Sequence, residues 1–220
     1  MANDTLKATL KDLRGFNFVL TRFNAKAEKH DDLDILVHSD DFNKVILSLE
    51  KLGYLRSSHD QALGGRLKGM QVNLTKSGRI KIDLHQDFTW RRQHYLNLDV
   101  LWENSRANRL DPIWDAFLVM INVIFEKTYF TKNEFEIFSP RWQTIRNSPE
   151  LVQQTIQYGW NNTFINFKSW MENQQRELKF PLFLPARLVL CSYLEKFDLI
   201  SFLYYLFFRT RYQLTRKLPY

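Results

Sequence analysis

The sequence predicts an α+β protein, with a small mixed β-sheet and its helices over residues 1–104 and an all-α domain over residues 105–220. Short runs in the first half alternate apolar and polar residues, which is typical of half-buried strands. From Asp111 onward the apolar residues recur at helical spacing instead. The chain has 220 residues, of which 45% are hydrophobic, and this is enough to form a substantial core.

Helices and strands alternate in the first half. The clearest element is a helix that Ser39 or Asp40 caps and Gly53 ends, because its apolar residues share one face. Two alternating runs joined by the turn sequence KSG predict an antiparallel hairpin. In order, the predicted elements are a helix over 3–13, strands over 16–21 and 32–37, a helix over about 40–52, and strands over 69–75 and 79–85.

The second half is predicted to be helical. Asp111-Pro112 and Ser148-Pro149 each place an N-cap residue before a proline at the first helical position. The boundary between the two domains is expected near 102–110, where the spacing of apolar residues changes. The predicted helices lie near 112–128, 149–159 and 161–178, and from Pro185 to the end of the chain.

Charge and cysteine content restrict the classes of function. The formal net charge of +7 favours an anionic partner, and it leaves nucleotides, nucleic acids and acidic lipids open. The single cysteine, Cys191, cannot form an internal disulfide, which favours a reducing, cytoplasmic location. The N-terminal sequence MANDTLKATLKDL lacks the apolar stretch of a signal peptide, and no apolar run is long enough to cross a bilayer.

Three acidic residues form the main candidate site. Asp32 and Asp34 alternate with aliphatic residues in DLDILV, so both side chains lie on one face of a strand, with Cα atoms about 6.5 Å apart. Asp83 lies on the polar face of the later strand RIKIDLH in the same sheet. Carboxylates this close resist joint ionisation unless a cation lies between them, and hard oxygen ligands suit Mg²⁺. The pattern therefore predicts a site for one or two magnesium ions and phosphoryl-transfer chemistry.

The order of these motifs resembles a known family. The segments KHDDLDILV, LEKLGY and IKIDLH are similar to the nucleotidyltransferase superfamily related to DNA polymerase beta, and most similar to its minimal nucleotidyltransferase-like proteins of bacteria and archaea. The resemblance covers roughly residues 10 to 100. It implies that Asp32, Asp34 and Asp83 are the catalytic, metal-binding triad. It also implies Mg²⁺-dependent transfer of a nucleoside monophosphate from an NTP such as ATP to an acceptor hydroxyl, whose identity the sequence leaves open.

The chain departs from the family at the end of its first strand. Family members have a Gly-Ser or Gly-Gly pair there, and glycine lets the backbone approach a phosphate closely. This chain has Thr21 and Arg22 instead, which offer a hydroxyl and a bidentate guanidinium. The candidate substrate-binding residues are Thr21, Arg22, Arg66, Lys68, Lys81 and His85.

The same departure supports an alternative function. A catalytically degenerate module would bind a nucleotide, RNA or a protein without transferring anything. The C-terminal segment 197–220 is aromatic in its first half and basic at its end, so it fits a buried terminal helix with a solvated basic end. Contact with RNA or an anionic membrane surface is the other interpretation of this segment, and burial is the preferred one.

Overall fold

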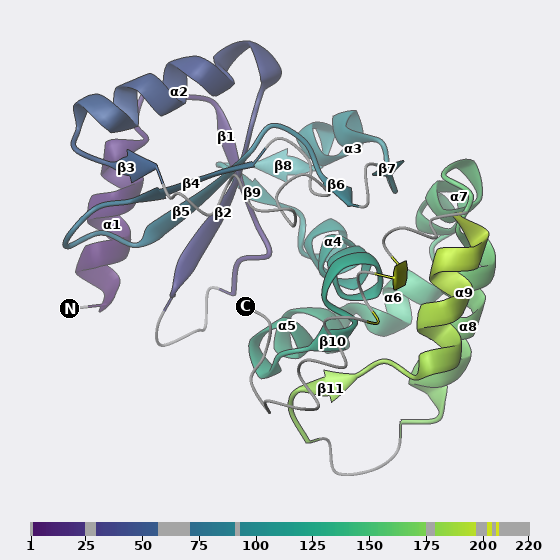
Figure 1. The fold of residues 1–220 in the computed structure, drawn as a ribbon. Coiled ribbons are helices and arrows are strands. Elements are labelled where there is room, and N and C mark those ends of the chain that lie inside the picture. The colour runs from purple at the N-terminus through teal and green to yellow at the C-terminus, as the bar shows by residue number, and fades with distance from the viewer. Residues whose placement is uncertain are drawn as a thin grey trace.

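The protein is described here from a computed structural model, which describes residues 2–24, 30–56, 71–90, 93–174, 179–196, 202–203 and 206. Its main sheet has seven strands in the order β3-β4-β5-β2-β1-β9-β8 (Figure 1). They are β1 (Phe18–Thr21), β2 (Asp32–Val37), β3 (Leu55–Arg56), β4 (Gln71–Thr75), β5 (Lys81–His85), β8 (Ser105–Arg106) and β9 (Arg109–Leu110). Two short pairs are β6 (Thr89–Trp90) with β7 (Gln93–His94), and β10 (Tyr129–Phe130) with β11 (Leu182–Phe183).

The helices fall into two groups along the chain. Those of the first half are α1 (Ala2–Asp12), α2 (Ser39–Lys51) and α3 (Leu98–Glu103). Those of the second half are α4 (Pro112–Asn122), α5 (Lys132–Phe138), α6 (Trp142–Asn147), α7 (Pro149–Gln157), α8 (Asn161–Glu172) and α9 (Ala186–Glu195). A π-helical turn, η2 (Val123–Lys127), continues α4, and a 3₁₀ turn, η3 (Ser139–Arg141), joins α5 to α6.

The predicted α+β fold class is confirmed. The central strand β2 pairs antiparallel with β1 and parallel with β5, so the sheet is mixed. Strands β8 and β9 come from the stretch where the sequence changes to helical spacing, and β9 joins the sheet by pairing parallel with β1. The main sheet therefore runs a few residues past 104, and the division into two domains at that position stays a prediction.

Each face of the sheet packs into a different core. Leu33, Ile35 and Val37 of β2 belong to a core that includes residues of α2 and Leu13, just after α1. Leu36, on the opposite face of β2, belongs to a second core with Phe117 and other residues of α4. Since side chains alternate along a strand, Asp32 and Asp34 share the Leu36 face. They therefore point toward the helical part of the molecule, between the sheet and α4.

The second core is rich in aromatic side chains. Trp160 is fully buried, and its indole Nε1 donates a hydrogen bond to the carbonyl of Tyr95 at 2.9 Å. Its ring lies 5.4 Å from Phe125 and 5.8 Å from Phe117, between ring centroids. Contacts of this kind fix the helices of the second half against α3 and the β6–β7 pair, and so place α4 relative to the sheet.

Most predicted elements are confirmed, with local differences. Asp111 and Ser148 cap α4 and α7 as predicted, accepting hydrogen bonds from the backbone N–H groups of Ile113 and Leu151. The expected cap of α2 by Ser39 or Asp40 is wrong, because the helix already begins at Ser39 and its N-cap is His38, without a side-chain hydrogen bond. The sequence patterns also did not reveal the elements between residues 129 and 147, which are too short to show a period.

Two predicted features lie outside what the structure describes. The glycine-rich loop with Arg66 and Lys68 falls in the segment 57–70, and most of the basic, aromatic segment 197–220 also lies outside the described residues. Within the described residues, none of the helices combines the length and the apolar character required to cross a membrane.

Candidate active site

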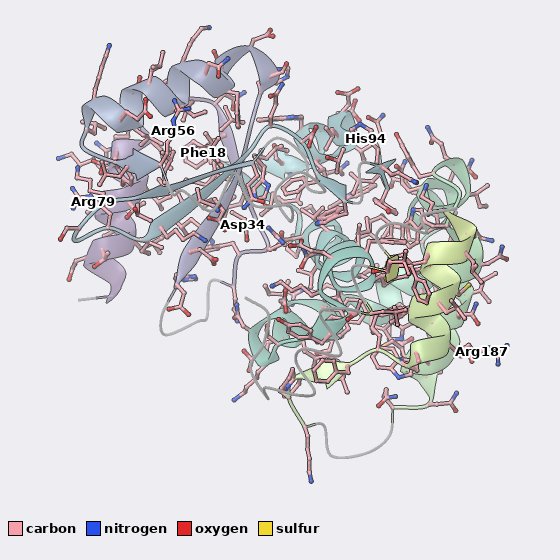
Figure 2. The ribbon with its side chains drawn as sticks, in the orientation of Figure 1. Phe18, Asp34, Arg56, Arg79, His94 and Arg187 are labelled. Atoms are coloured by element: carbon pink, nitrogen blue, oxygen red, sulfur yellow. The ribbon has the colours of Figure 1, made fainter. Side chains whose placement is uncertain are left out.

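The strand register brings the three predicted acids together. Asp34 of β2 is the direct partner of Asp83 on the parallel strand β5, and Asp32 is the partner of Lys81. Partners in a parallel ladder point to the same side of the sheet. All three carboxylates therefore lie on the face toward the helical part, and Figure 2 shows Asp34 between that part and the sheet. Strand periodicity predicted that Asp32 and Asp34 share one face, and the pairing of β2 with β5 puts Asp83 on the same face.

Asp34 is a largely enclosed acid of the site. Its side chain is 16% exposed, and its Oδ1 accepts a very short hydrogen bond from Nη2 of Arg22 and a 3.0 Å hydrogen bond from Nε2 of His85. Burial alone would raise the pKa of Asp34, but the Arg22 guanidinium and the bond from His85 outweigh it and hold that pKa well below its usual range. Asp34 is therefore a charged carboxylate that already has a cationic partner.

Lys81 lies between the other two acids. Its Nζ is 2.8 Å from Oδ1 of Asp83, donates a hydrogen bond to Oδ2 at 3.0 Å, and lies 3.9 Å from Asp32. Oδ1 of Asp83 is buried, and among the described residues its close partner is this lysine ammonium. Burial and the neighbouring charge of Asp34 raise the pKa values of both Asp83 and Asp32, although Lys81 opposes the shift. Asp83 thus binds a proton more readily than an ordinary aspartate.

Arg22 reaches the site from a strained backbone. It follows β1 with φ of 54°, a left-handed conformation that side-chain-bearing residues rarely adopt. The carboxylate of Asp115 on α4 accepts hydrogen bonds from the backbone N–H groups of Arg22 and Phe23, the latter at 3.1 Å. Consecutive N–H groups form a natural anion site, and here a carboxylate of the protein occupies it. Burial raises the pKa of Asp115 to about 7, against the effect of these two hydrogen bonds.

The other candidate residues divide into two groups. His85 lies in the site beside Asp34, and its ring is 4.7 Å from that of Phe88, between centroids. Thr21 is buried and is the ladder partner of Asp34, so its side chain lies on the carboxylate face, where its hydroxyl donates to the backbone carbonyl of Asp34 at 3.4 Å. Arg66 and Lys68 lie outside the described residues, and no structural role is assigned to them here.

The helical part adds groups that the sequence patterns did not single out. Asp115 holds the loop after β1, and Lys127 on η2 is close enough to lower the pKa of Asp34 and Asp32 by its charge. Lys127 binds Glu134 at 2.8 Å and precedes Thr128, whose φ is 62°. A signal for Asp115 was available, since a lone acid inside the apolar helix sequence PIWDAFLVMIN must have a buried partner.

The donor chemistry of the site fits a divalent ion. Three carboxylates on adjacent strands are the ligands that Mg²⁺ prefers. In the part of the chain that the structure describes, however, no three His, Cys, Asp or Glu side chains converge as a ready-made ligand set. Arg22 and Lys81 supply the positive charge around the acids instead. The groups that would bind a metal are present, but two side-chain cations contact them.

Comparison with known proteins gives one structural likeness to report. No family model matches the chain, and no curated protein matches it. The solution structure of the antibiotic-resistance factor ANT(2'')-Ia, an aminoglycoside nucleotidyltransferase, superposes with a TM-score of 0.44 at 12% sequence identity. The match covers 78% of this chain and 97% of that chain. No comparison identifies the narrower group of minimal nucleotidyltransferase-like proteins.

Proposed function

We propose that the protein is a Mg²⁺-dependent nucleotidyltransferase, which moves a nucleoside monophosphate from an NTP to an acceptor hydroxyl. The observation that carries this proposal is the register that pairs Asp34 with Asp83 on adjacent parallel strands, with Asp32 two residues away on the same face. A half-buried strand face seldom collects three carboxylates without a cation to bind, because their mutual repulsion and desolvation cost stability.

In this reaction the acceptor oxygen forms a bond to the α-phosphorus of the NTP. The bond from that phosphorus to the oxygen bridging to the β-phosphate breaks, and pyrophosphate leaves. Asp32, Asp34 and Asp83 would hold the magnesium, which neutralises charge on the attacking and leaving oxygens. Asp83, which lies on the same face as the other two acids, is also the candidate base for the acceptor proton.

The cations around the acids would bind the triphosphate. Arg22 and Lys81 reach the site from the sheet, and Lys127 reaches it from the helical part. An arginine binds phosphate oxygens in a bidentate manner, and lysine acts as a point charge. The helical part would then shape the acceptor side of the site, consistent with the orientation of the carboxylates toward it.

A specific observation also favours a second function. Asp34 pairs with Arg22 and Asp83 pairs with Lys81, so the acids are neutralised by the protein itself. A degenerate nucleotide-binding module would keep these ion pairs permanently and would bind the nucleotide through its cations. Such a module would bind NTPs without transferring them.

Incubation with α-³²P-labelled NTPs, Mg²⁺ and a cell extract tests the two functions against each other. Asp34→Asn and Asp83→Asn should each lower labelling of an acceptor by at least about a hundredfold, because an amide cannot replace a metal-binding carboxylate. The matched control is Asp12→Asn, at the last residue of α1. Asp12 is 13% exposed and bound to Arg79, much as Asp34 is 16% exposed and bound to Arg22. The Asp12→Asn variant should label the acceptor to the same extent as the wild type.

The outcomes separate clearly. Label transfer by the wild type and by Asp12→Asn, but not by Asp34→Asn, supports the enzyme. Binding of NTPs without any transfer, unchanged in both site variants, favours the degenerate module. Equal transfer by all four proteins would refute the assignment of the acids, provided that thermal melting shows each variant to be folded.

A further inference from the structure

The Arg22 guanidinium is an unusual group to find beside a candidate metal-binding carboxylate. Its side chain is only 11% exposed, and Nη2 contacts Oδ1 of Asp34 while lying 3.5 Å from Nε2 of His85. Its Nε is buried and has no hydrogen-bond partner among the described residues. The guanidinium is therefore well neutralised, but only part of its hydrogen-bonding capacity is used where it lies.

The backbone and the side chain of Arg22 are held by different partners. Asp115 fixes the backbone N–H groups of Arg22 and Phe23, and Asp34 binds the guanidinium. Rotation about the side-chain bonds can thus move the guanidinium away from Asp34 while the strained backbone stays in place. Phe88, whose ring centroid is 5.9 Å from Cζ of Arg22, provides an aromatic surface beside this side chain.

We propose that Arg22 competes with the divalent ion for Asp34, and that its guanidinium leaves for the phosphates when the nucleotide binds. The inference rests on the proposed function for the identity of the ligands, a divalent ion and a nucleoside triphosphate. Oδ1 of Asp34 already accepts hydrogen bonds from Arg22 and His85, and a guanidinium and a divalent ion repel each other, so an ion that binds this oxygen competes with Arg22. A triphosphate offers Arg22 several anionic oxygens, including partners for the unused Nε.

This arrangement makes an unusual prediction for the two ligands. Removal of the Arg22 charge should strengthen metal binding, because the competitor is gone. The same change should weaken nucleotide binding, because a charge-assisted contact with the phosphates is lost. If Arg22 had only a structural role, its replacement would weaken the binding of both the metal and the nucleotide, since a distorted site binds neither ligand well.

The experiment measures Mn²⁺ affinity by electron paramagnetic resonance without nucleotide, and the affinity for a non-hydrolysable ATP analogue at saturating Mn²⁺. Arg22→Gln should bind Mn²⁺ at least about tenfold more tightly than the wild type and the analogue at least about tenfold more weakly. Arg22→Met keeps the apolar stem beside Phe88 and should behave alike, so it replaces Arg22→Gln if that variant does not fold. Arg22→Lys keeps the charge and should keep Mn²⁺ affinity within about threefold of the wild type.

The matched control is Arg79→Gln. Arg79 forms an ion pair with Asp12 at 2.8 Å and lies away from Asp34, on the side of the sheet next to α1 (Figure 2). This variant should leave both affinities unchanged. Equal or weaker Mn²⁺ binding by folded Arg22→Gln or Arg22→Met would overturn the inference, as would the absence of Mn²⁺ binding in every protein.

Failure of the inference and failure of the proposed function have different signatures. Tighter Mn²⁺ binding by Arg22→Gln, with no label transfer by the wild type, supports the competition and refutes the enzyme. Label transfer by the wild type together with unchanged Mn²⁺ affinity in Arg22→Gln refutes the competition alone.

Discussion

Asp115 predicts a measurable pH dependence of folding stability. The carboxyl is 6% exposed, and burial raises its pKa to about 7 from the ordinary value of 3.8, although the N–H groups of Arg22 and Phe23 favour the charged form. The substitution Asp115→Asn keeps the size of the side chain and one acceptor oxygen, but it removes the titration. The difference in unfolding free energy between the wild type and this variant should therefore change with pH.

The sign follows from the direction of the pKa shift. The folded chain holds the Asp115 proton more tightly than the unfolded chain, so this proton stabilises the fold fully below the unfolded pKa of 3.8. The stabilisation is lost as the pH rises through the folded pKa of about 7. Each unit of pKa corresponds to about 1.4 kcal/mol, so the wild type should lose on the order of 4 kcal/mol relative to Asp115→Asn across this window.

Urea unfolding at several pH values between about 4.5 and 8 measures this difference. The control is Asp12→Asn, because hydrogen bonds from Arg79 and Tyr54 lower the pKa of Asp12 in spite of its burial. The stability that Asp12 contributes is present above its unfolded pKa and is lost only at lower pH, so its difference from the wild type should stay constant over the same range. If the difference in unfolding free energy between the wild type and Asp115→Asn is also constant over this range, the buried Asp115 in contact with the loop after β1 does not take up a proton there.

Three further substitutions test the packing and the backbone by urea unfolding. Trp160→Ala removes a fully buried ring and its hydrogen bond to Tyr95, so it should lower the free energy of unfolding by about 3–5 kcal/mol. The control Ile165→Ala, at a 53% exposed position, should lower it by less than about 0.5 kcal/mol. A loss below about 2 kcal/mol for Trp160→Ala would contradict the core assignment. Gly53→Ala should cost about 1 kcal/mol from its φ of 88° alone, since an added Cβ meets no atom within 4 Å, and a neutral result would refute the strain. Glu195→Gln should lower the free energy of unfolding by about 1–2 kcal/mol, because Glu195 accepts hydrogen bonds from the backbone N–H groups of Asn162 and Thr163 at the start of α8. An unchanged urea midpoint would count against this cap.

The alternation of apolar and polar residues predicted the strands and the orientation of the acids. In DLDILV and RIKIDLH apolar residues alternate with polar ones that include the three acids, so the face on which each acid lies follows directly from the sequence. The parallel pairing that aligns Asp34 with Asp83 is a tertiary feature, and it required the resemblance to a known strand order. Sequence spacing thus placed these acids on one face, and the register of the folded sheet made them partners.

The contributions of the helical part could not be predicted in the same way. Lys127 lies close enough to Asp34 and Asp32 for its charge to lower their pKa values. It belongs to a π-helical turn that precedes the left-handed Thr128, and neither feature has a periodic signal. The short strands β8 and β9 formed in the stretch expected to separate the domains, because two-residue strands show no alternation. Such features depend on contacts between distant parts of the chain.

The loop after β1 has Thr21 and Arg22 where the family that the sequence resembles has a glycine pair. The N–H groups of Arg22 and Phe23 point to Asp115 of α4, so this backbone is already bound to an anion and is not available to a phosphate. Under the proposed function the phosphates must therefore bind to side chains, and Arg22, Lys81 and Lys127 are the cations placed to do so. Asp115 on α4 thus supports the left-handed backbone that Arg22 adopts, because its carboxylate accepts hydrogen bonds from the N–H groups of this turn.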